Sequence, residues 1–205
     1  MKTFKDYIIE MPPQYVQPTD FNFDDDLFNR NYCKKLLKSS KLKLLDTNFK
    51  NGSKLYQEGY KIFLENSGKI LYYMQYEINN FKPIKEKITT QIILWKKRGG
   101  GSDLTGLPSK IFFDIVLENT GIVSTDKDQT TDGEDFWIDR LGQAFEDSLF
   151  IYYINTNSPI EFIKIHDMIE FKKIRTEKNL WGFGTRYQSK RLIISKINLD
   201  DYLKY

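Results

Sequence analysis

Three consecutive glycines, Gly99 to Gly101, divide this chain into two stretches of different pattern. Adjacent glycines have too much backbone freedom to continue a strand or a helix, so residues 96–103 are predicted to form a loop. Before the loop, from Leu42 to Lys97, short β-rich runs alternate with Asn and Gly clusters, which is typical of an antiparallel meander. After the loop, strand-like and helix-like segments alternate, which indicates a parallel or mixed sheet.

Three helices are predicted from apolar spacing and from end signals. The first continues to Leu37 after Asp26, which can cap it. The second opens at Pro108 and ends at Gly121, because proline suits a first turn and glycine suits a helix end. The third opens at Thr131, where Thr131 and Glu134 form a capping-box pattern.

The predicted strands are short and separated by turn residues. They cover residues 42–49, 60–64, 70–78, 88–95, 122–124, 149–154, 160–165, 168–174 and 191–195. The fold class that follows is α/β (α+β): a mixed sheet with antiparallel N-terminal strands and then a β-α-β-α-β order. Residues 1–40 are expected to form an N-terminal arm and helix, and residues 41–205 the sheet domain.

Charge, cysteine content and hydropathy exclude several classes of protein. The net charge of +3 is too small to argue for nucleic acid as a partner. The single cysteine, Cys33, cannot form an internal disulfide, and we expect it to have a structural role in the first helix. Apolar runs of the length of a signal peptide or a membrane span are absent from the sequence. We therefore expect a soluble, cytoplasmic protein without a membrane partner.

The element order resembles that of the GNAT superfamily of N-acetyltransferases. In that family the loop after the fourth strand holds the coenzyme A pyrophosphate with backbone amides, and a helix starts immediately after it. Free amides at a helix N-terminus favour phosphate in general. The resemblance implies acetyl-CoA as the cofactor. It implies a cofactor-binding site made of Arg98, Gly99, Gly100, Gly101, Gly106 and Lys110.

The catalytic groups do not follow the pattern of that family. The family commonly takes a Glu base from the strand before the loop, and the predicted strand 88–95 contains no acid. It commonly takes a Tyr acid from the later helix, and residues 132–147 contain no Tyr. Tyr152 and Tyr153, on the following strand, are the candidates that remain for the acid. Asp103 also has the wrong charge to lie beside a pyrophosphate.

A second resemblance covers the segment from Ser124 to Trp137. Its residues 124–130, together with Gly133, Phe136 and Trp137, are similar to a pattern in uncharacterised GNAT-like proteins of tailed phages. This resemblance implies a phage-type protein, in the host cytoplasm or in the virion. Two functions stay open: an acetyl-CoA-dependent N-acyltransferase, or a non-catalytic scaffold that binds a virion or host protein.

Two further patterns partly resemble metal sites. Residues 128–139 partly match a calcium loop, but the twelfth position holds Asp139 where a bidentate Glu is expected. Glu170 and Lys172 on the predicted strand 168–174 resemble half of the motif of metal-dependent nucleases. Neither pattern supplies a complete set of ligands, so no metal site is predicted.

Overall fold

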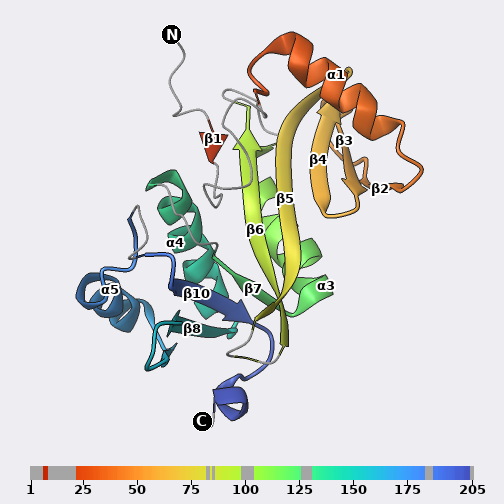
Figure 1. Ribbon diagram of the computed structural model, residues 1–205. Helices are drawn as coiled ribbons and strands as arrows, with labels where there is room; N and C mark the ends of the chain where they lie inside the picture. The colour runs from red at the N-terminus through yellow and green to blue at the C-terminus, as the bar shows by residue number, and fades with distance from the viewer. Residues whose placement is uncertain are drawn as a thin grey trace.

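The computed structural model describes residues 7–8, 22–81, 84, 86–97, 104–125, 131–182 and 187–203. Within these residues the chain forms a sheet of ten strands with helices packed against it (Figure 1). The strands are β1 (Tyr7–Ile8), β2 (Leu42–Asp46), β3 (Lys54–Glu58), β4 (Lys61–Asn66), β5 (Lys69–Phe81), β6 (Glu86–Lys96), β7 (Ile122–Ser124), β8 (Phe150–Asn155), β9 (Glu161–Ile165) and β10 (Lys190–Ser195). The helices are α1 (Asp26–Leu37), α2 (Leu107–Lys110), η4 (Ile111–Leu117), α3 (Glu118–Thr120), α4 (Thr131–Glu146), α5 (Met168–Glu177) and η5 (Asp200–Leu203).

The strand order is β2-β3-β4-β5-β6-β7-β10-β8-β9, and β1 pairs with β6 outside this path. The pair β6–β7 is parallel, and the other described strand pairs are antiparallel. The predicted fold class, a mixed sheet with antiparallel N-terminal strands, is therefore confirmed. Among the described residues, no helix is long and apolar enough to cross a membrane.

The side chains of each strand alternate between the two faces of the sheet. On one face, Tyr72 and Leu94 pack in the main core with α4 and the helical residues 107–117. On the other face, their neighbours Tyr73 and Trp95 pack with Phe23 and with α1. Helices therefore cover both faces of the central strands, and α1 of the predicted arm shares a core with β5. The boundary at residue 40 stays a prediction.

The structure corrects three local predictions. Asp25, and not Asp26, is the N-cap of α1, since its carboxylate accepts from the Phe28 N–H at 2.8 Å. Strand β3 was not predicted. The predicted strand 168–174 is wrong, because these residues begin α5. The Asp167 carboxylate caps this helix by accepting from the backbone N–H groups of Ile169 and Glu170, both at 2.8 Å.

Asn29 joins α1 to β5 at a point beyond the end of the neighbouring strand β6. β6 ends at Lys96, opposite Tyr72, so the backbone of Ile70 lies beyond it. The Asn29 side chain takes the place of the missing strand: its Nδ2 donates to the Ile70 carbonyl at 3.0 Å, and its Oδ1 accepts from the Ile70 N–H at 2.7 Å. Nδ2 also donates to the carbonyl of Phe23 at 3.0 Å. The buried side-chain amide of Asn29 thus forms hydrogen bonds with three backbone groups.

We expect Asn29→Ala to lower the free energy of unfolding by about 2–4 kcal/mol, because it leaves buried backbone groups of Ile70 unpaired. Arg30→Ala is the matched control on the same helix. It removes only an exposed ion pair with Asp26 and should cost less than about 1 kcal/mol. Urea unfolding of the two variants measures both values, and equal losses would contradict the role given to Asn29.

Candidate functional site: the fork between β6 and β7

β6 and β7 run side by side over two residue pairs and then separate. Thr89 pairs with Val123, and Thr90 pairs with Ser124. At this last pair the hydroxyls of Thr90 and Ser124 lie 3.3 Å apart. β6 continues for six more residues to Lys96, whereas β7 ends at Ser124. Figure 1 shows the two strands diverging from this point, with β1 beside the far end of β6. We call the opening between them the fork.

Two local features open the fork. On β6, Ile93 pairs with Gln75 and Gln91 pairs with Tyr76, so Ile92 is an extra residue relative to β5. A bulge of this kind bends its strand. On the other side of the fork, buried Thr125 follows β7 and binds Leu192 of β10 twice. Its N–H donates to the Leu192 carbonyl at 2.9 Å, and its Oγ1 accepts from the Leu192 N–H at 3.1 Å. The chain after β7 is therefore held by β10.

A helix starts near the open end of the fork. After β6 the chain reaches Gly106, which takes a left-handed conformation with φ 72° and precedes the first turn of α2. α2, η4 and α3 follow one another without a break, so residues 107–120 form one helical run. This run connects two parallel strands, and its N-terminus therefore lies at the carboxyl end of β6, where ligands of such units bind. Gly121 ends the run with φ 76°, as predicted.

Arg140 of α4 places a buried positive charge against this helix start. Its side chain is 7% exposed, and its Nη1 donates to Ser109 Oγ in the first turn at 2.8 Å. The guanidinium carbon lies 4.4 Å from the ring centroid of Phe136. Nε has no hydrogen-bond partner, and no ion pair of Arg140 with a carboxylate is found within the described part of the chain. A buried cation that makes no ion pair is costly, so this position favours an anion.

Two polar groups lie within electrostatic range of the Arg140 guanidinium: the Tyr72 hydroxyl of β5 and the Asp139 carboxylate. Among the described residues, the buried Tyr72 hydroxyl has no hydrogen-bond partner. Burial lowers the pKa of Arg140 and raises that of Tyr72. Both shifts have the same cause, which is loss of contact with water. The charge adds to the partial positive charge that the helix itself carries at its first turn.

The structure describes only two of the predicted cofactor-binding residues, Gly106 and Lys110. Arg98, Gly99, Gly100 and Gly101 lie outside the described residues. Gly106 is at the helix start, as predicted. Lys110 lies one turn later, and its exposed ammonium pairs with the Asp46 carboxylate of β2 at 2.6 Å. This ion pair lowers the pKa of Asp46, and it directs Lys110 toward β2.

The predicted catalytic tyrosines of β8 face opposite sides of the sheet. The Tyr152 hydroxyl donates to Asn198 Oδ1 and accepts from the Leu199 N–H, both at 2.8 Å. Tyr153 packs in the main core on the side of α4, and no partner of its hydroxyl is found among the described residues. Burial raises the pKa of each tyrosine to about 12. Both hydroxyls are therefore protonated at neutral pH.

The alternative metal sites gain no support. No group of three His, Cys, Asp or Glu side chains that could hold a metal gathers in the described residues. Glu170 lies on a helix, and its carboxylate accepts from the His166 N–H at 2.8 Å. The predicted nuclease strand that would carry Glu170 and Lys172 is thus absent. Asp128, which begins the calcium-loop pattern, lies outside the described residues.

Arg140 is the candidate site residue that the sequence interpretation missed. The apolar face predicted for α4 contains Phe136, Leu141 and Ala144, and Arg140 is four residues from two of them. Side chains at this spacing share one face of a helix. An arginine within an apolar face was therefore visible in the sequence.

Comparisons with known proteins find little. No protein-family model matches the sequence, and no curated protein matches it. Among solved structures, the chain is similar to the diaminobutyrate acetyltransferase EctA from Paenibacillus lautus, solved with L-2,4-diaminobutyric acid and coenzyme A. That likeness has a TM-score of 0.36 and 12% identity, and it covers 67% of this chain and 70% of the other. At this level it carries no argument about ligand or reaction.

We expect Thr125→Val to lower the free energy of unfolding by about 1–3 kcal/mol, because it leaves the buried Leu192 N–H without an acceptor. Thr90→Val is the control at the base of the fork. It removes only the long hydroxyl contact with Ser124 and should cost less than about 1 kcal/mol. Urea unfolding measures both values. A larger loss for Thr90→Val would contradict the role given to Thr125.

Proposed function

We propose that this protein binds coenzyme A or its acyl thioester in the fork and acts as an N-acyltransferase. The observation that carries the proposal is the buried Arg140 guanidinium, which makes no ion pair among the described residues and is held against the first turn of the helical run 107–120 at the open end of the fork. An anion bound there would supply the missing counter-charge. A diphosphate suits a site that combines a helix start with a guanidinium.

The edge of β6 suits the extended arm of the same ligand. β7 no longer pairs with Gln91, Ile92 and Ile93, and no other described strand pairs with these three residues on this edge. The arm of coenzyme A carries two amide groups, which can hydrogen-bond to a strand edge as a peptide does. Arg140 and the helix start would hold the phosphate end, and the β6 edge would orient the arm. The bound acyl thioester would supply the group that is transferred.

Acyl transfer from a thioester to an amine forms a C–N bond and breaks the C–S bond. The leaving sulfur takes up one proton and the amine releases one, so the proton released by the amine can restore the acid that protonates the sulfur. A protonated tyrosine can donate to the sulfur, and we assign this role to Tyr153 in preference to Tyr152. Tyr153 faces the side of the sheet that carries the helical run, whereas the Tyr152 hydroxyl is engaged by Asn198 and Leu199.

The second candidate function is a non-catalytic scaffold that binds a protein partner. The engagement of Tyr152 favours it, because one of the two candidate acids already has a structural role. The phage association, in the host cytoplasm or the virion, rests on the sequence resemblance of residues 124–137 and stays a proposal. So does a virion or host protein as the partner.

Calorimetric titration with coenzyme A and acetyl-CoA tests the proposed function. We expect micromolar binding by the natural chain and at least about tenfold weaker binding by Arg140→Met, which removes the charge. Removing an unpaired buried charge should leave the free energy of unfolding within about 1 kcal/mol. Weaker binding by this variant would then not reflect unfolding.

Arg175→Met is the matched control for this titration. Arg175 lies on α5, and its guanidinium already pairs with Glu134 at 2.5 Å. Its removal should leave the affinity unchanged. Absence of binding at millimolar ligand, or equal effects of the two arginine variants, would contradict the proposed site. Absence of binding would favour the scaffold.

A further inference from the structure

The N-terminal strand β1 lies on the edge of β6 that faces the fork. A strand has two edges, and β5 pairs with one edge of β6 along its whole length, from Phe81–Glu86 to Tyr72–Lys96. β1 therefore occupies the other edge, the one that pairs with β7 at Thr89 and Thr90. Its two residues pair antiparallel with Leu94 and Trp95.

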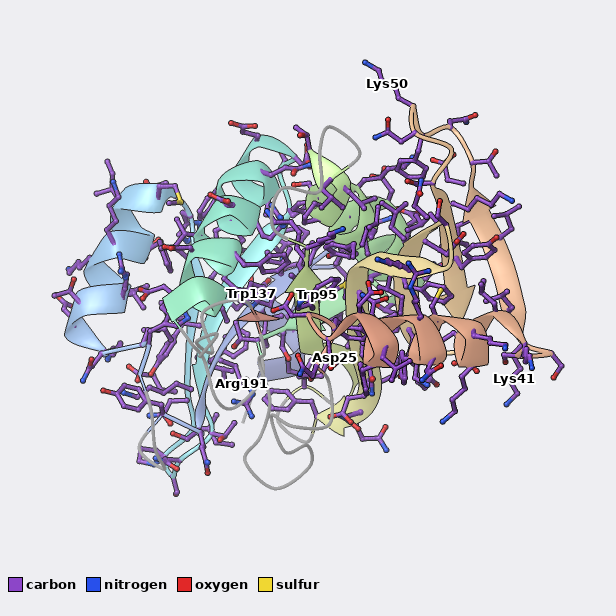
Figure 2. All side chains as sticks on the ribbon, turned by 90° about the horizontal axis from the view of Figure 1, so that it is seen from above. Asp25, Lys41, Lys50, Trp95, Trp137 and Arg191 are labelled. Atoms are coloured by element: carbon purple, nitrogen blue, oxygen red, sulfur yellow. The ribbon has the colours of Figure 1, made fainter. Side chains whose placement is uncertain are left out.

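β1 begins on this edge four residues after β7 leaves it. The last β6 residue paired with β7 is Thr90, and the first paired with β1 is Leu94. In Figure 1 β1 lies beside the upper end of β6, on the side of α4. Figure 2, seen from above, labels Trp95 of β6 and Trp137 of α4 toward the middle of the molecule, far from Lys41 and Lys50 at the rim. The fork thus lies between two middle strands of the sheet order, and the chain itself supplies a strand to it.

We infer that β1 is a built-in competitor for the fork: it pairs with the strand edge that the extended ligand needs, and it must leave before the ligand binds fully. This inference rests on the proposed function. The backbone N–H and C=O groups on one edge of Leu94 and Trp95 cannot serve two extended partners at once. A strand of two residues makes few hydrogen bonds, so binding of a ligand can displace it.

Competition of this kind weakens binding by the fraction of molecules in which the edge is free. If β1 is paired in about nine molecules of ten, its removal strengthens binding about tenfold. At low ligand concentration, β1 would stay paired with Leu94 and Trp95 of β6. It would also couple ligand binding to release of the N-terminal segment.

The double variant Tyr7→Pro/Ile8→Pro tests the inference in the full chain. Proline lacks the backbone N–H and does not suit a paired strand, so the variant should lose the β1–β6 pairing. Thr3→Pro, outside β1, is the matched control. Calorimetry with coenzyme A should show about tenfold tighter binding by the double variant and unchanged binding by the control. Unchanged or weaker binding by the double variant would overturn the inference.

Hydrogen exchange separates this inference from the proposed function. In the ligand-free protein, the peptide that contains Leu94 and Trp95 should exchange faster in the double variant than in the natural chain and the control. Exchange at the same rate in all three would overturn the inference. If none of the proteins binds coenzyme A, the proposed function fails. Faster exchange in the double variant would then still support β1 as the occupant of the edge.

Discussion

The separation of β6 from β7 is the constraint on which the candidate site depends. Two backbone features produce it: the bulge at Ile92 bends β6, and the two hydrogen bonds between Thr125 and Leu192 hold the chain after β7 to β10. A sheet that stayed paired at this point would leave no strand edge open at its centre. The only parallel pair among the described strands is thus also the place where the sheet opens.

A buried charge lies next to this opening. Arg140 contacts Ser109 and the ring of Phe136, and it makes no ion pair among the described residues, although the Asp139 carboxylate lies within electrostatic range. We propose that this buried cation binds an anionic group of the ligand. The helix start and the guanidinium then act together on the same ligand group. In our account, Arg140 and the helix start bind the anionic group of the ligand, and β1 competes with the ligand for the edge of β6.

Strong local signals made much of the fold predictable from the sequence. The Gly121 helix end, the start of α4 at Thr131 and the strand at residues 122–124 are all as predicted. Residues 168–174 were predicted wrongly, because their short apolar pattern fits a strand as well as a helix and the Asp167 cap decides between them. The fork depends on a bulge and on a contact 67 residues apart in sequence, which no local pattern encodes. Arg140 was visible in the sequence, but its burial and its lack of an ion pair among the described residues required the tertiary structure.

The most direct test of the account is an NMR titration of the ¹⁵N-labelled protein with coenzyme A, observing the Arg140 Nε–H and the backbone amides of β6. The account predicts that saturation shifts the Arg140 Nε–H resonance and the amides of residues 91–95 together, with one binding constant. Shifts confined to another surface, such as the exposed lysines at the end of α1 that include Lys34, Lys35 and Lys38, would contradict it. So would a spectrum that coenzyme A leaves unchanged.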